Sequence, residues 1–244
     1  MAIANDITPF SAHRWVKLLL SANEKYGSQY QNNTGFVTAI NEMKSWNFEL
    51  AANSKPALKY AYWRAQLMRD SEGTKMKLLA QRIDCYREPL GVVPESVQLS
   101  INEAQFFIRS FSNALSKLKS NFGTIDMSYG DVYRIGRGNQ SWPSEGGMSE
   151  FIGLTTLHSV QYGQERKDHT RWAQSGQTST GIVILSNPIQ SWTCVPFGQS
   201  DNPVSIHYSD QAEKLFMARK MKSTWWTPEE LESHIESSNL IDIK

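Results

Sequence analysis

Phe197-Gly-Gln-Ser-Asp-Asn-Pro-Val-Ser-Ile-His-Tyr-Ser-Asp-Gln-Ala-Glu-Lys-Leu-Phe216 is the most informative segment of this 244-residue chain. Composition alone favours a strand that runs into an irregular loop, with Asp210 near the positive end of a following helix. A generic loop requires no particular order of residues, whereas this one places donors, acceptors and a charge between two apolar residues.

We predict that this segment contains a structural signature near the core, with several side chains buried and joined by hydrogen bonds. Its members are Gly198, Gln199, Ser200, His207, Tyr208, Asp210 and Gln211. None is assigned a catalytic role, and for His207 a structural role is favoured over a catalytic one.

Residues 8–122 are predicted to be mainly helical. Apolar residues recur at helical spacing from Trp15 and from Phe36, and Pro56 suits a first helical turn, where its missing N–H costs nothing. Gly123 can adopt the left-handed conformation that ends a helix. The clearest amphipathic stripe before it consists of Ala104, Ile108, Phe111, Leu115 and Leu118.

After Gly123 the helical period disappears, and residues 123–244 are predicted to form antiparallel strands and two closing helices. The continuous apolar run 182–185 is typical of a strand covered on both faces. Thr227 is a good cap for the last helix. The predicted strands are 131–137, 154–162, 170–175, 178–186 and 191–197, and the predicted helices are 209–219 and 228–237. No linker separates domains, so the chain is interpreted as one α+β unit.

The charge balance argues against nucleic acid as a partner, because 25 basic and 24 acidic residues leave a net charge of only +1. No apolar run reaches the roughly 18 residues that a membrane span needs, and the first twenty residues contain no secretion signal. The two cysteines predict neither a zinc site nor a disulfide framework, and a Cys85–Cys194 bridge remains open.

No cofactor or metal site is predicted. Gly136-Arg-Gly138 begins like a dinucleotide fingerprint, but Ser141 follows where a third glycine belongs and no helix is predicted there. Metal ligation would need clustered donors, whereas the histidines are scattered at positions 13, 158, 169, 207 and 234.

The order of residues in 198–211 resembles the penicillin acylase family, whose members carry a Gly-Gln-Ser…His-Tyr-x-Asp-Gln segment near the end of their large chain. Residues 129–138, with the Pro and Gly-Gly that follow, resemble the family's Trp-Gly-Asp-Val-x-Arg-x-x-Arg-Gly segment. Residues 222–234 resemble its aromatic strand and final capped helix, and 43–47 its Leu-Arg-Ala-Trp-Asp run. The likeness covers nearly the whole chain and points to the branch of acyl-homoserine-lactone and lipopeptide acylases.

The resemblance implies an N-terminal-nucleophile hydrolase with an α/β/β/α sandwich, of which this chain would be the carboxy-terminal portion. In such enzymes a precursor cleaves itself, and the exposed serine attacks a linear amide with its own α-amino group as base. A backbone N–H and an Asn side chain hold the oxyanion. The resemblance also implies a small-molecule amide substrate, the remainder of the large chain and the small chain as partners, and a periplasmic or secreted location.

This sequence departs from the family at the nucleophile. It starts with Met1-Ala2, and the nearest internal alternative, Gly27-Ser28-Gln29-Tyr30, lacks the Asn of the family's Ser-Asn-x-Trp processing sequence. We therefore predict an inactive fragment and leave open a gene fragment, a truncated reading frame or one piece of a split enzyme. The alternative is a non-catalytic binding or assembly module. A fragment should expose unpaired strand edges and apolar faces.

Overall fold

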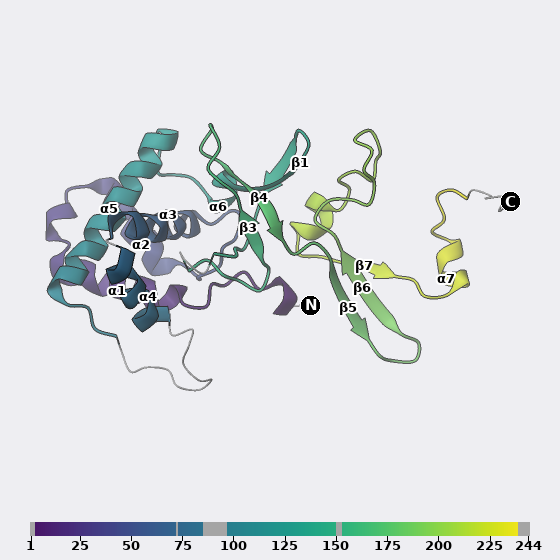
Figure 1. The fold of residues 1–244 in the computed structure, drawn as a ribbon, viewed down its shortest axis with the longest axis horizontal. Coiled ribbons are helices and arrows are strands. Elements are labelled where there is room, and N and C mark those ends of the chain that lie inside the picture. Colours follow the sequence, from purple (N-terminus) through teal and green to yellow (C-terminus); the bar gives the residue numbers. More distant parts are fainter. Residues whose placement is uncertain (1–2, 72, 85–96, 150–152, 239–244) are drawn as a thin grey trace. The chain divides into compact units, whose positions relative to one another are not determined.

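The chain divides into two compact units, Ala2–Gln177 and Thr178–Lys244, each with a sheet of its own (Figure 1). The computed structural model describes residues 3–71, 73–84, 97–149 and 153–238. The boundary between the units lies within the predicted run of strands, at Gly176-Gln-Thr-Ser-Thr-Gly181, a stretch of small and polar residues that was not interpreted as a linker.

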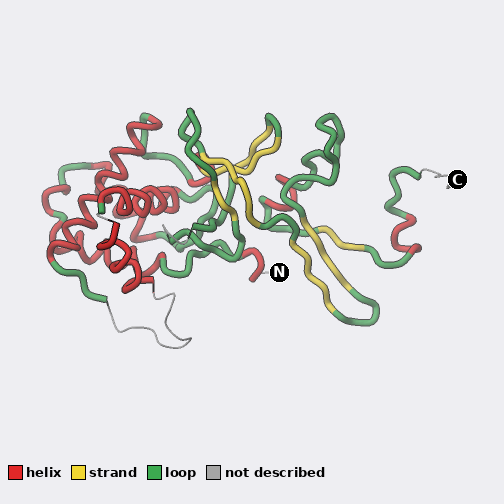
Figure 2. Tube along the Cα trace, viewed as in Figure 1, coloured by secondary structure: helices red, strands yellow, loops and turns green. Residues whose placement is uncertain are grey.

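In the unit Ala2–Gln177, helices come first and strands follow (Figure 2). Its helical elements are η1 (Ile3–Asn5), α1 (Ala12–Tyr26), η2 (Ser28–Tyr30), α2 (Thr34–Ser45), α3 (Lys55–Asp70), α4 (Gly73–Asp84), α5 (Ile101–Phe122) and α6 (Tyr129–Val132). The predicted helical character of 8–122 is confirmed for the residues described. Helix α6 was not predicted, because a single turn is too short to show a helical period.

Polar side chains close the ends of these helices. The side chains of Asn33 and Ser54 each accept a hydrogen bond from the backbone N–H three residues on, at the starts of α2 and α3. Ser100 and Glu103 form a reciprocal capping box at the start of α5. Gly123 ends α5 with a φ of 76°, as predicted.

An aromatic core lies where α1 and α3 pack against α5. The Trp15 ring stacks on Phe107 at 5.6 Å, and Trp63 meets both Phe107 and Phe111 edge to face at 5.4 and 6.0 Å. Such pairs add about 0.5–1.5 kcal/mol each beyond their buried area. The predicted α5 stripe is confirmed, since all of its members are buried: Ala104, Ile108, Phe111, Leu115 and Leu118.

Two charged pairs are also enclosed in this unit. Arg64 is fully buried on α3, and its Nη2 lies 3.8 Å from Oδ2 of Asp84 on α4. Lys59, also on α3 and buried, pairs with Glu42 at 2.7 Å. Helix α3 is therefore buried around most of its circumference rather than on the single face that its apolar pattern predicts.

The first sheet has the strand order β2-β1-β4-β3. Its strands are β1 (Tyr133–Arg137), β2 (Gln140–Pro143), β3 (Val160–Tyr162) and β4 (Arg171–Gly176). Neighbours are antiparallel as predicted, except that β1 and β4 run parallel. Gly138 has a φ of 60° in the turn between β1 and the unpredicted β2, so the Gly-Arg-Gly run forms a hairpin and no helix follows it.

The unit Thr178–Lys244 contains the antiparallel sheet β5-β6-β7, formed by β5 (Thr180–Ile184), β6 (Gln190–Cys194) and β7 (Lys222–Thr224). The predicted helix 209–219 is reduced to one π-helical turn, η3 (Ala212–Phe216). The predicted helix 228–237 is shorter, α7 (Pro228–Glu232), and Thr227 caps it as predicted. Strand β7 lies at the start of 222–234, where the resemblance implies a strand before the final capped helix, although its three residues alone give no alternation to detect.

The apolar run in and after β5 is exposed, so the prediction that it is covered on both faces is wrong for the residues described. Val183 is 52% exposed, Ile184 48% and Leu185 89%. Strand β5 also forms an edge of its sheet, with β6 on one side and no described strand on the other. The expected combination of an open strand edge and exposed apolar residues is therefore present here. Across the residues described, no helix is both long and apolar enough to cross a bilayer.

Candidate functional site

The predicted signature residues lie in the loop that leaves β6 and enters η3. Gln211, the last of them, is buried and joins the two ends of this loop. Its side-chain Oε1 accepts a hydrogen bond from the N–H of Val195 at 3.3 Å, and its own N–H donates to the carbonyl of Phe197 at 2.8 Å. Gln211 therefore fixes how the strand enters the helical turn, which is the role predicted for the signature as a whole.

Gly198 brings two parts of the loop into direct contact. A Cβ at this position would overlap the carbonyl oxygen of His207 and lie 2.7 Å from Oδ1 of Asp210. The same His207 carbonyl accepts a hydrogen bond from the N–H of Ser200 at 3.1 Å. A glycine is needed here because the backbone approaches too closely for any side chain.

His207 is held between two carboxylates. Its Nδ1 lies 2.8 Å from Oδ2 of Asp210, and its Nε2 lies 2.7 Å from Oε2 of Glu236. Hydrogen bonds to Asp210 and then Glu236 raise the pKa of the imidazole above its usual value. With both ring nitrogens occupied by acceptors, His207 is poised to hold a proton rather than to take one from a nucleophile.

The burial predicted for the signature is wrong for most of its members. Gln199 and Asp210 are exposed, and Ser200, His207 and Tyr208 are only partly covered. The polar groups of this loop therefore pair at the surface of their unit, with one another and with Lys222 and Glu236 outside the loop. The sequence did not reveal this because its flanking residues, Phe197 and Phe216, suggested an apolar setting on both sides.

The Tyr-Gly-Asp-Val-Tyr-Arg segment at 129–134 packs against the polypeptide that follows it. Gly130 lies so close to Pro143 and Ala52 that a Cβ would touch both. Arg134 donates to the carbonyls of Gly130 and Ser141 at 3.0 and 3.1 Å. Gly130 and Arg134 in this segment thus have structural roles.

Cys194 is buried, and desolvation raises the pKa of its thiol to about 11. It is therefore a thiol at neutral pH and a poor nucleophile. Cys85, the other half of the open bridge, lies outside the described residues, as does the chain break predicted at 91–94.

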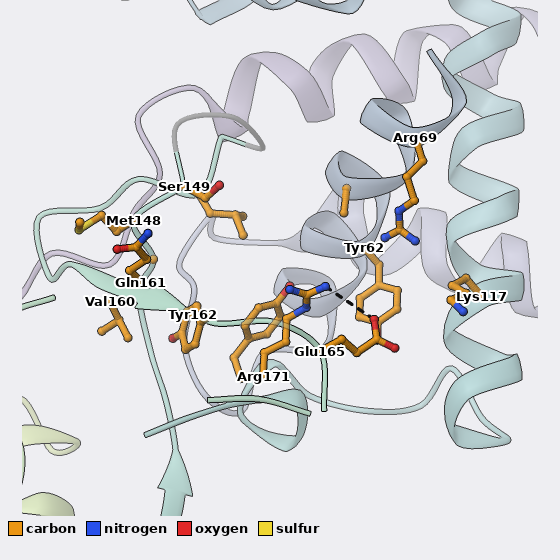
Figure 3. A pocket seen from close by; sticks show the side chains of 14 residues that line it. Tyr62, Arg69, Lys117, Met148, Ser149, Val160, Gln161, Tyr162, Glu165 and Arg171 are labelled. Atoms are coloured by element: carbon orange, nitrogen blue, oxygen red, sulfur yellow. Dashed lines mark ion pairs between the residues drawn. The ribbon is translucent and has the colours of Figure 1, made fainter. Parts of the chain in front are cut away.

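A pocket of about 310 Å³ in the unit Ala2–Gln177 was not predicted (Figure 3). Helices α3 and α5 supply Tyr62, Ala65, Arg69 and Lys117, and the sheet with its loops supplies the remaining wall. The lining residues are Tyr62, Ala65, Arg69, Lys117, Tyr133, Gly147, Met148, Ser149, Leu154, Val160, Gln161, Tyr162, Glu165 and Arg171. No local motif marks this pocket, because its residues come from segments far apart in the sequence.

Three tyrosines line the pocket, and two of them pack in an aromatic cluster with Tyr129. Tyr133 stacks on Tyr129 at 4.3 Å and meets Tyr162 edge to face at 4.8 Å. The Tyr162 hydroxyl lies 2.8 Å from Ser144 Oγ. Burial raises the pKa of Tyr62, Tyr133 and Tyr162, so each phenol keeps its proton at neutral pH.

Comparison with known proteins agrees with the resemblance seen in the sequence. The sequence model of the family described as penicillin amidase matches residues 1–233. The penicillin G acylase of Escherichia coli is 23% identical over 178 residues, which cover 69% of this chain and 19% of that protein. The aligned region thus spans about a fifth of the length of this relative. Since the family match extends over nearly the whole chain, the protein belongs to the penicillin amidase family.

Proposed function

We propose that this chain forms the carboxy-terminal part of the large chain of an acylase-type amidohydrolase, which hydrolyses a linear amide to a carboxylic acid and an amine. The family match over residues 1–233 is the observation that carries the proposal. The chain's role in that enzyme is to complete the protein around an active site that other segments supply.

The nucleophile in this proposal is an N-terminal serine upstream of Met1, with its α-amino group as base. Two features support a non-catalytic role for His207 and Cys194, the residues of this chain that could otherwise act as base or nucleophile. His207 has both ring nitrogens paired with carboxylates, and the Cys194 thiol has a raised pKa. Neither group is prepared for nucleophilic attack or for proton abstraction.

The partners in this proposal are the remainder of the large chain and the small chain of the acylase. Strand β5 supports this, because it offers an unpaired edge and exposed Val183 and Ile184 within the described part of its unit. A strand added at that edge would satisfy backbone groups and cover apolar surface in one step. The completed sandwich and a periplasmic or secreted location belong to the same proposal.

The substrate class is a small acyl amide, and acyl-homoserine lactones, acyl lipopeptides and penicillin-type amides are the compounds to compare. The Escherichia coli relative is a penicillin G acylase.

The test is expression of the chain alone and together with an in-frame upstream segment that carries Gly-Ser-Asn-x-Trp. Each preparation is assayed by mass spectrometry for release of acid and amine from the three amide classes. A serine-directed covalent probe then identifies the labelled chain. We expect hydrolysis only with both parts present, and labelling only of the upstream segment.

Hydrolysis by the chain alone, surviving repeated purification and lost in a Ser or His207 variant of this chain, would overturn the proposal. A complex that forms without any hydrolysis would instead support the alternative of a non-catalytic assembly module.

A further inference from the structure

We propose that the pocket between α3, α5 and the first sheet binds a small organic carboxylate, with its apolar body against the tyrosines and its carboxylate facing Arg69 and Lys117. The proposal concerns the unit Ala2–Gln177 only and does not depend on the proposed amide hydrolysis.

The pocket has the size and walls of a small-molecule site. Its volume of about 310 Å³ is at the lower end of the range of ligand pockets. Tyr62 and Tyr133 are almost fully buried, and Leu154 and Val160 add aliphatic surface. A flat or short apolar group is the ligand body that such walls favour.

The charge balance around the pocket is positive, with three cations and one carboxylate in its lining. Glu165, the single carboxylate, is already engaged, since it lies 2.6 Å from His169 Nδ1 and 3.6 Å from Arg171 Nη2. Arg171 also donates to the carbonyl of Gly163 at 3.1 Å. Glu165 therefore neutralises groups other than Arg69 and Lys117.

Arg69 and Lys117 have no hydrogen-bond or ion-pair partner among the residues that the structure describes. Figure 3 shows them on separate helices around the side chain of Tyr62, near the Glu165–Arg171 ion pair. Two unpaired cations at one pocket favour an anionic ligand, and a carboxylate can accept from both.

Tyr133 provides an independent observation. Its side chain is only 4% exposed and it lines the pocket, yet its hydroxyl has no hydrogen-bond partner within the described residues. Burial raises the pKa of Tyr133, and the nearby Arg171 and Arg69 act in the opposite direction. The Tyr133 oxygen is not one of the unpaired polar atoms sealed from solvent, so it opens to the pocket that it lines, where a ligand oxygen can accept its hydrogen bond.

Tyr62 can supply a second hydroxyl donor. Asn121 Nδ2 approaches the Tyr62 oxygen at 3.5 Å, which leaves the phenolic proton available. Two neutral donors and two cations around apolar walls suit a carboxylate with a hydrocarbon body better than a fully hydrated inorganic anion.

The experiment is isothermal titration of the full 244-residue chain with benzoate, its neutral analogue benzamide, hexanoate and inorganic phosphate. We expect saturable binding of benzoate or hexanoate, and at least about tenfold weaker binding of benzamide, because the charge-assisted hydrogen bonds are lost. Arg69→Gln and Lys117→Gln should each weaken the affinity for benzoate by at least about threefold, and Tyr133→Phe should weaken it by a similar factor.

Lys119→Gln is the matched control, since Lys119 lies on α5 but does not line the pocket. The affinity of this variant for benzoate should equal that of the unmodified chain. Thermal melts of every variant separate loss of binding from loss of folding, and nuclear magnetic resonance shifts of the unmodified chain locate the ligand. Equal binding of benzoate and benzamide, preference for phosphate, absence of binding, or shifts remote from Tyr62 and Tyr133 would each overturn the proposal.

Discussion

The guanidinium carbon of Arg64 lies 3.4 Å from the centroid of the Trp15 ring, and both side chains are fully buried. The indole N–H of Trp15 in turn donates to Oδ1 of Asp84 at 2.5 Å. A cation, an aromatic face and a carboxylate thus connect α1, α3 and α4 in the interior of one unit. Burial of Arg64 depends on both partners, because either alone would leave part of its charge uncompensated.

Replacing Asp84 by Ala should lower the free energy of unfolding of this unit by about 3–5 kcal/mol, because Arg64 would remain buried without its counter-ion. Urea denaturation followed by tryptophan fluorescence measures the change. Asp126→Asn is the control, since Asp126 pairs with Lys55 at the exposed surface and its loss should leave the transition unchanged. Equal transitions for the two variants would show that Asp84 does not stabilise Arg64.

Gly198→Ala should destabilise the unit Thr178–Lys244, because the new methyl group would overlap the carbonyl of His207. Gly181→Ala in β5 is the matched control, since its Cβ would enter open space. We expect a lower melting temperature for Gly198→Ala, and little change for the control. Hydrogen exchange of the amides in β6 can assign the loss to this unit. Unchanged exchange in both variants would contradict the close approach seen at Gly198.

His207 should titrate above its ordinary value of about 6.5, and Asp210→Asn should lower its pKa. Because the pKa is raised in the folded state, the stabilising contribution of protonated His207 is fully present below about pH 6.5 and is lost as the pH rises through the raised value. Imidazole proton shifts in nuclear magnetic resonance measure this directly. Since Asp210 is exposed, we expect only a small change in melting temperature for Asp210→Asn. An unshifted His207 in the unmodified chain would show that the two carboxylates do not hold its proton.

Substituting Ile184 by Lys in β5 should reduce self-association of the isolated chain, since it places a charge on an open, apolar strand edge. Sedimentation velocity over a range of concentrations measures the effect, with binding of a hydrophobic dye as a second readout. Glu229→Lys in α7 is the control. It reverses an exposed charge outside the strand and should not reduce self-association. If both variants self-associate like the unmodified chain, β5 is not the surface through which the chains associate.

The sequence predicted elements whose stabilisation is local. The α5 stripe and Gly123 follow directly from periodicity and from backbone conformational preference, so the structure agrees with them. The prediction that the apolar run at 182–185 is covered on both faces failed, because a covered strand and a strand with exposed apolar residues can have the same composition. Burial depends on what packs against a strand, and that information is not contained in the strand.

The signature loop was partly predictable, because some of its contacts are local and others depend on the surrounding packing. Hydrogen bonds within this loop were predicted, and the N–H of Ser200 donates to the carbonyl of His207. The exposure of Asp210 follows from the surrounding packing and was not accessible to a local pattern. The pocket was entirely missed, since Arg69, Lys117 and Arg171 are brought together only by the tertiary fold.

The open edge of β5 must be shielded soon after it is synthesised if the chain is not to self-associate. The helices of Ala2–Gln177 leave the ribosome first, and their core can close once α5 has emerged to pack on α1 and α3. Strand β5 emerges afterwards, with unpaired backbone groups and apolar side chains that can join the same strand of a neighbouring nascent chain. The yield of soluble protein in a cell should therefore depend on how soon that edge is shielded, by a chaperone or by a binding partner, more than on the stability of the helical unit itself.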